Sequence, residues 1–288
     1  MGNQLFQYAA ACSLASKNND ILKIDVLGYQ PGRNQKQIYR NLDITDFSIS
    51  AAIATSEEVN KTKNRWGFFS KVLRLFRQKI LKLYYVDWHP EILDQAGNIY
   101  LDGYFQSEKY FLGRVDQILS EFTLKPDLCN EIEPIVQLIK CKPISVSLHI
   151  RRGDYVENPK TMQYHLVCDI GYYERAIAYM QQKYSNLHLF IFSDDPDWVR
   201  KNLSVTHATF ISSDKGAENS LKPSQELVLM SKCDHHILSN SSFSWWGAYL
   251  NQSTCKTVLV PDIWNNGYIS QPNIVPESWL RFPVLKDA

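Results

Sequence analysis

The chain has 288 residues, of which 44% are hydrophobic and 21% charged, and its formal net charge is +1. This composition provides for a sizeable core and excludes bulk disorder, while the near-zero charge argues against generic nucleic-acid binding. The six cysteines form no Cys-x-x-Cys pair, and no apolar run approaches the roughly 18 residues that span a bilayer. We therefore expect an intracellular protein in a reducing, cytoplasmic compartment.

The first half of the chain predicts a mixture of helices and strands. Helices are expected over 5–17, 66–85, 107–122 and 129–140, and strands over 21–26 and 98–105. A polar stretch over 28–45 contains Gly and Pro and is expected to form loops. Lys142-Pro143 then interrupts the helical pattern, so we expect two α/β domains that meet near residue 142 with a cleft between them.

The second half alternates more regularly between apolar runs and helical patterns. Strands are expected over 144–150, 187–192, 209–211, 235–238 and 257–260, and helices over 171–184, from Asp195-Pro196 onward, over 224–232 and over 244–250. Repeated β-α units of this size predict a parallel sheet that is covered by helices on both faces.

The first motif is His149-Ile150-Arg151-Arg152-Gly153-Asp154-Tyr155, which directly follows an expected buried strand. In open α/β sheets, ligands bind beyond the carboxyl ends of the strands. Paired guanidinium groups suit phosphate oxygens because each makes charge-assisted hydrogen bonds and keeps its charge. The motif indicates anion capture, most simply of a diphosphate. The alternative is a solvated basic turn.

The second motif is Asn240-Ser241-Ser242-Phe243-Ser244-Trp245-Trp246-Gly247, between an expected strand and an expected helix. Hydroxyls and unpaired backbone N–H groups at a helix N-terminus attract anions. The alternative is ordinary serine capping followed by two core tryptophans. Together with the arginine pair, the motif favours a phosphate site.

The third motif is Ser193-Asp194-Asp195-Pro196-Asp197-Trp198, again after a strand. The pair Asp195-x-Asp197 resembles the D-x-D element with which many sugar-nucleotide enzymes hold a divalent metal. Because Pro196 favours a helix start, Asp195 is more simply an N-cap and Asp197 a first-turn acid. An acid at this place could also accept hydrogen bonds from a base such as guanine.

Residues 61–83 form a basic amphipathic pattern in which lysines and arginines accompany apolar residues at helical spacing, with no acid among them. Such a helix either lies peripherally on an anionic membrane surface or packs on its own domain with a solvated basic face. Both interpretations stay open.

Taken together, the motifs resemble glycosyltransferase family 11, the α-1,2-fucosyltransferases that use GDP-L-fucose, and its bacterial members in particular. The resemblance rests on four segments in the expected order, which are Gly2–Tyr8, His149–Tyr155, Phe192–Asp195 and Asn240–Gly247. It implies a GT-B fold of two Rossmann-like domains, with 1–142 on the acceptor side and 143–288 binding GDP-fucose. It also implies inverting transfer of fucose to the 2-hydroxyl of a terminal β-galactoside, in bacterial surface glycan synthesis such as that of O-antigen. The resemblance implies that no metal or cofactor is required, and GDP-L-fucose is the donor substrate.

The resemblance further implies roles for individual residues. Arg151 would contact the β-phosphate, Arg152 would support it and His149 would help to place the nucleotide. The rest of the donor site would comprise Ser193, Asp194, Asn240, Ser241, Ser242 and Phe243. Asn3 matches an asparagine that lies near the transferred sugar in more distant relatives. Asp154 would be either the catalytic base or a partner that holds one of the arginines.

One departure concerns the start of the chain, because family members usually begin with a strand and Gly-Gly-x before Gly-Asn-Gln. We therefore expect Met1 to be an internal methionine of a longer protein whose N-terminal strand is missing here. Two alternatives to a fucosyltransferase stay open: a non-catalytic nucleotide- or carbohydrate-binding module, and a metal-dependent sugar transferase using Asp195 and Asp197.

Overall fold

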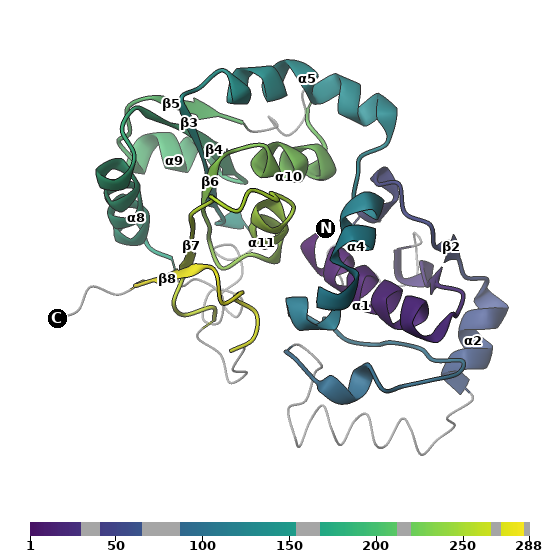
Figure 1. Ribbon diagram of the computed structural model, residues 1–288. Helices are drawn as coiled ribbons and strands as arrows, with labels where there is room; N and C mark the ends of the chain where they lie inside the picture. The colour runs from purple at the N-terminus through teal and green to yellow at the C-terminus, as the bar shows by residue number, and fades with distance from the viewer. Residues whose placement is uncertain (30–40, 65–86, 154–167, 212–219, 266–271, 285–288) are drawn as a thin grey trace. The chain divides into compact units, whose positions relative to one another are not determined.

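The computed structural model describes residues 1–29, 41–64, 87–153, 168–211, 220–265 and 272–284 (Figure 1). The chain divides into two compact units. The first comprises Met1, Asn3–Thr123 and Gln271–Ile274, and the second comprises Gly2, Leu124–Ser270 and Val275–Ala288. The division falls before the expected boundary at residue 142, because helix α5 (Pro126–Lys140) belongs to the second unit, where Gln225 of α10 donates hydrogen bonds to Leu128 and Glu131.

The second unit contains a six-stranded, wholly parallel sheet in the order β5-β4-β3-β6-β7-β8. Its strands are β3 (Ile144–Ile150), β4 (Leu187–Ser193), β5 (Ala208–Phe210), β6 (His235–Ile237), β7 (Val258–Pro261) and β8 (Leu280–Phe282). The expected parallel α/β sheet is confirmed. The sequence reasoning missed β8, whose residues Leu280 and Arg281 are exposed and do not form an apolar run.

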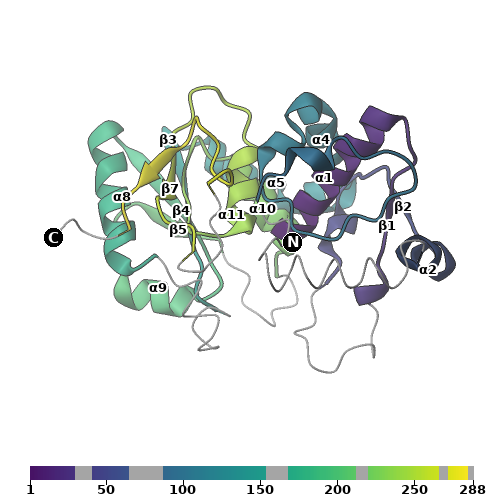
Figure 2. The ribbon, with the colours of Figure 1, turned by 90° about the horizontal axis from the view of Figure 1, so that it is seen from below.

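Helices cover both faces of this sheet (Figures 1 and 2). They are α5, α8 (Ile170–Lys183), α9 (Pro196–Asn202), α10 (Pro223–Ser231) and α11 (Ser242–Tyr249). Val146, Leu148 and Ile150 of β3 pack with α8 and α9 in one buried cluster. Because successive side chains of a strand point to opposite faces, Ser145, Ser147 and His149 lie on the other face.

The first unit is mainly helical. Among its described residues, the regular elements are α1 (Gly2–Asn18), α2 (Ser56–Asn64), α4 (Val115–Glu121) and the parallel pair β1 (Lys23–Ile24) and β2 (Ala52–Ile53), with 3-10 turns at Leu27–Tyr29, Asp43–Asp46, Pro90–Ile92, Glu108–Tyr110 and Leu112–Arg114. Helix α1 is the alanine-rich helix that the sequence predicts, and it ends at Asn19, which adopts the left-handed conformation typical of a C-cap.

A buried carboxylate joins three segments of the first unit. Glu121 accepts hydrogen bonds from the Tyr8 hydroxyl, from the backbone N–H and hydroxyl of Ser50, and from the Gln117 amide. These donors hold the pKa of Glu121 below its usual range although burial acts in the opposite direction. The carboxylate therefore links α1 and α4 to the chain before β2.

Two predictions for the first unit are wrong. No strand covers 98–105 among the described residues, because the backbone of Phe105 is left-handed (φ 51°) and the Ser107 N–H turns back to the Phe105 carbonyl. The helix expected over 107–122 is reduced to α4, because the Ser107 hydroxyl accepts from the Lys109 N–H and starts a 3-10 turn instead.

Other expectations fall outside the described residues. They are the helix over 66–85, all of the basic 61–83 segment beyond residue 64, and Asp154 with Tyr155. Among the helices that the structure describes, none is long and apolar enough to cross a bilayer.

Candidate functional site

The order of the strands singles out one place on the sheet of the second unit. From β3 the chain proceeds to β4 and β5 on one side, and then crosses to β6, β7 and β8 on the other side. The strand order therefore reverses between β3 and β6, and such a reversal opens a crevice at the carboxyl ends of the two strands. His149 and Arg151 stand at the end of β3, and Ser239–Ser241 follow β6, so two sequence motifs meet there.

His149 connects these two motifs physically. Its Nδ1 lies 2.8 Å from the Ser239 hydroxyl, and its ring centroid is 5.6 Å from that of Phe243. Burial, and to a smaller extent the charge of Arg151, lower the pKa of His149 to about 3. The imidazole is therefore neutral at physiological pH, and it can only serve as a hydrogen-bonding and packing group.

A ladder of polar contacts, whose members other than the exposed Asp234 are buried, holds β3 against β6 beneath the site. Ser145 bonds to Asp234 at 2.7 Å, and Ser147 lies 2.7 Å from His236 Nδ1, whose Nε2 is 2.9 Å from Asn251 Nδ2. Burial also keeps the pKa of His236 well below its usual range. The His149–Ser239 contact is the last step of this ladder, so the buried polar pairs set the position of the imidazole.

The two arginines contact two consecutive aspartates at the end of β4. Arg151 Nη1 lies 2.7 Å from Asp194 Oδ2, and Arg152 Nε lies 3.5 Å from Asp195 Oδ2. The Arg152 guanidinium also covers the ring of Trp198 at 3.6 Å. The pair is therefore anchored on one side and is not a freely solvated basic turn.

The second motif forms the start of α11. Ser241 is the N-cap, and its hydroxyl accepts from the Phe243 N–H at 3.3 Å. Trp245 and Trp246 are fully buried, whereas Ser242 and Phe243 are partly exposed. The capping alternative is thus correct for Ser241 and the two tryptophans. In the first turn of α11, Ser242 and Phe243 are the residues of the motif that stay partly exposed.

In the third motif, the last two acids have structural partners. Asp195 is the N-cap of α9, where it accepts from the Trp198 N–H, and the exposed Asp197 pairs with Arg200 at 3.1 Å. Both carboxylates therefore have partners other than a metal. Within the described ranges, no three His, Cys, Asp or Glu side chains gather as a metal site.

Two further predicted donor residues make structural contacts. The buried Asn240 donates to the Trp264 carbonyl at 3.0 Å, and it thereby ties the loop after β6 to the loop after β7. The Ser193 hydroxyl accepts from the Asp195 N–H at 3.1 Å. Both residues lie at the carboxyl ends of their strands, on the side of the sheet where the arginines are.

In the first unit, Asn3 accepts a hydrogen bond at 2.9 Å from the amide of Gln106, which is buried. The neighbouring residues of the N-terminal motif serve the fold. Gln4 bonds to the backbone of Asn41 and Ile44, and Gln7 donates to the Gly103 carbonyl. Asn3 thus differs from Gln4 and Gln7, because its partner is a side-chain amide and theirs are backbone groups.

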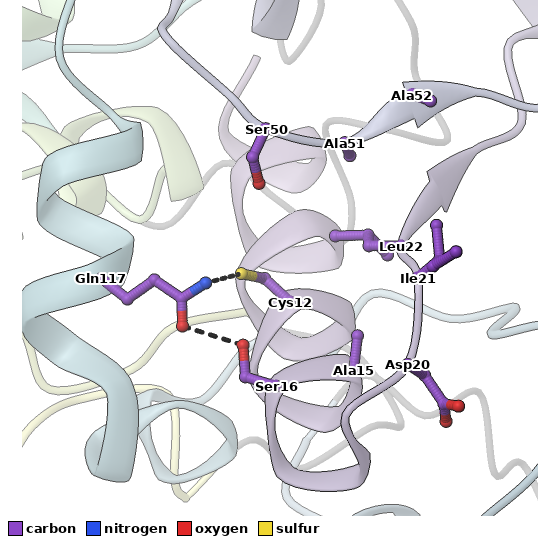
Figure 3. Close-up of a pocket in the computed structure, with 10 residues that line it drawn as sticks. All are labelled: Cys12, Ala15, Ser16, Asp20, Ile21, Leu22, Ser50, Ala51, Ala52 and Gln117. Carbon is purple, nitrogen blue, oxygen red and sulfur yellow. Dashed lines mark hydrogen bonds between the residues drawn. The ribbon is translucent and has the colours of Figure 1, made fainter.

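The pocket of the first unit shown in Figure 3 has a volume of about 190 Å³. There the Gln117 side chain accepts from Ser16 and donates to the Cys12 thiol. The ten lining residues are Cys12, Ala15, Ser16, Asp20, Ile21, Leu22, Ser50, Ala51, Ala52 and Gln117. They include no cationic side chain and none of the predicted site residues, so this pocket is unsuited to a phosphorylated ligand.

Sequence reasoning missed Ser239, Gln106 and Trp198 as partners of the site residues. Ser239 stands directly before the Asn240 motif, and Trp198 is three residues from Asp195, so both lay within reach of a motif-based argument. Gln106 is 103 residues from Asn3, and no local pattern joins the two.

The family model described as glycosyl transferase family 11 matches residues 1–281. The chain belongs to this family. Two relatives from Escherichia coli are each 30% identical. The α-1,2-colitosyltransferase aligns over 98% of this chain and 95% of its own length, and the O-antigen biosynthesis glycosyltransferase WbnK over 98% and 97%. The galactoside 2-alpha-L-fucosyltransferase SEC1 of Bos taurus is 29% identical over 57% of this chain and 46% of its own length.

A solved structure with the same fold is the α-1,6-fucosyltransferase NodZ co-crystallised with GDP, at a TM-score of 0.52 and 15% identity over 86% of this chain and 88% of that one. At that identity the likeness concerns the fold, which is of the GT-B type. Family membership makes the protein a glycosyltransferase.

Proposed function

We propose that this protein transfers L-fucose from GDP-L-fucose to the 2-hydroxyl of a terminal β-galactoside. The observation that carries the proposal is the convergence at the reversal of strand order. Arg151 extends from the end of β3, and the first turn of α11 follows β6 at the same edge of the sheet. A guanidinium and a helix N-terminus are the two protein groups best suited to a diphosphate.

The leaving group of this reaction is GDP, whose β-phosphate gains negative charge as the bond to the sugar breaks. A pre-positioned guanidinium stabilises that charge in the transition state and takes the place of a divalent metal. We assign this role to Arg151, with support from Arg152 and from the positive end of the α11 helix dipole. His149 is neutral, so it contributes a polar group beside the diphosphate but no charge of its own.

Inversion at the sugar requires a base that accepts the proton of the acceptor hydroxyl. We propose Asp154 for this step, since only Gly153 separates it from the arginine pair in the sequence. Asn3, held by Gln106, is proposed to contact the transferred sugar. Neither role depends on a metal, and we expect full turnover in the presence of EDTA.

The name of the Bos taurus relative supports a fucosyl donor and a galactoside acceptor, and that of one Escherichia coli relative supports a colitosyl donor. We favour fucose as the donor sugar and place the colitosyl group second. The experiment is therefore product analysis with GDP-fucose and the GDP ester of colitose, each with lactose and other β-galactosides. A fucosyl-α-1,2-galactoside product with GDP release supports the proposal.

Two results would reject the proposal. Transfer from the GDP ester of colitose but not from GDP-fucose would reassign the donor sugar. Nucleotide binding without transfer to any glycan would indicate a binding module. Activity that disappears in EDTA and returns with Mg²⁺ would instead favour the metal-dependent mechanism with Asp195 and Asp197.

A further inference from the structure

The carboxylate of Asp194 contacts three consecutive residues of the loop after β3. Its Oδ1 accepts from the Arg152 backbone N–H at 2.8 Å, and its Oδ2 lies 2.7 Å from Arg151 Nη1. Gly153 is so close that a Cβ placed there would come within 2.6 Å of Asp194 Oδ2. One side chain at the end of β4 therefore determines the course of the loop that carries the arginines.

The exposed fractions of the two side chains fit an inward-facing support. The Asp194 side chain is 15% exposed, whereas the Arg151 side chain is 33% exposed. A guanidinium carries five N–H donors in a rigid fork and can serve a carboxylate and a phosphate together. In this arrangement the arginine is accessible to a ligand, and the aspartate lies behind it.

We propose that Asp194 is a positioning residue that acts on the diphosphate through Arg151, and that it makes no contact of its own with the guanine base. This inference rests on the proposed GDP-sugar site. Asp194 holds the guanidinium in place before the donor arrives, so that little conformational freedom is lost when the diphosphate binds. The neighbouring Asp195 contacts Arg152 instead and caps α9, so the two acids have separate tasks.

Binding of GDP and GMP to variants distinguishes the two roles of Asp194, because GMP has the base but no β-phosphate. For Asp194→Asn we expect GDP affinity to fall by about 10- to 100-fold, the usual effect of a misplaced binding group. GMP affinity should stay within about twofold. In an Arg151→Ala background, most of the effect of Asp194→Asn on GDP binding should disappear, because the main group through which it acts is gone.

Two further variants serve as a check and a control. Gly153→Ala should reproduce the selective loss of GDP affinity, because the added methyl group displaces the carboxylate from Arg151. Asp197→Asn is the matched control. Asp197 lies three residues after Asp194, and its exposed side chain pairs with Arg200, so the substitution removes the same charge without touching Arg151. It should leave both affinities unchanged. Thermal unfolding of each variant verifies that it is folded.

Equal losses of GDP and GMP affinity in Asp194→Asn would overturn the inference in favour of a direct base contact. An undiminished effect in the Arg151→Ala background would overturn it as well, and so would unchanged GDP binding in Asp194→Asn. If the wild-type protein itself bound no GDP, the proposed function would fail together with the inference. Wild-type binding and turnover with an unaffected Asp194→Asn would refute the inference alone.

Discussion

Acidification should destabilise the second unit through His149. This imidazole is buried between β3 and the loop after β6, and its pKa is lowered to about 3. The pKa of an unfolded histidine is about 6.5. Because the folded pKa is the lower of the two, the native state binds fewer protons than the unfolded state at any pH between them. The stability that is present above pH 6.5 is therefore lost progressively as the pH falls toward 3.

The size of the effect follows from the two pKa values. Each pH unit within this window removes about 1.4 kcal/mol, so the loss between pH 7.5 and pH 5 amounts to about 2 kcal/mol. The loss becomes complete only near pH 3, and urea unfolding at pH 5 avoids that extreme. His236 is also buried with a lowered pKa, but it titrates in the wild type and the variant alike.

The assay is urea unfolding at pH 7.5 and pH 5.0 for the wild type and His149→Gln, followed by tryptophan fluorescence, to which the buried Trp245 and Trp246 of α11 contribute. The glutamine does not titrate, so the drop in unfolding free energy between the two pH values should be smaller by about 2 kcal/mol than in the wild type. His207→Asn is the control, since His207 is exposed and asparagine tolerates its left-handed backbone (φ 54°). If His149→Gln lost as much stability on acidification as the wild type, the reasoning would be wrong.

Three further predictions concern stability and are measured by urea unfolding at neutral pH. Glu121→Gln should destabilise the first unit by about 3 kcal/mol, because a buried carboxylate that accepts several hydrogen bonds is replaced by an amide with the wrong donors; a loss below about 1 kcal/mol would contradict this. Gly247→Val should cost about 1–3 kcal/mol, since even a Cβ lies 2.9 Å from Met230. Gly28→Ala, which meets nothing within 4 Å, is its control and should change stability little. Asp195→Ala should cost about 1 kcal/mol through the lost α9 cap, and Asp195→Ser should restore most of it.

The second unit was largely predictable from its sequence. Its short apolar runs are separated by helical patterns. Strands of a parallel sheet that is covered on both faces have such continuous apolar runs. The Asp195-Pro196 start of α9 follows from local capping chemistry alone. The first unit was less predictable because its strands have two residues each, and because the conformation of Phe105 depends on tertiary packing.

The sequence predicted the parts of the candidate site that lie within one continuous motif. It did not predict contacts between residues that are far apart in the sequence. The motifs around Arg151 and Ser241 were identified, and the parallel sheet explains why they meet. The partner of Arg151 could not be found in this way. The sequence places Asp154 three residues from Arg151, whereas the described contact is with Asp194, which only the pairing of β3 with β4 brings near. Asp154 itself lies outside the described residues, and its role as base stays a prediction.

The structure of the protein with GDP bound would test the central claim most directly. We predict that the diphosphate lies at the carboxyl ends of β3 and β6, with Arg151 on the β-phosphate and the N-terminal turn of α11 beside it. A nucleotide bound elsewhere, with Arg151 making no phosphate contact, would contradict the claim.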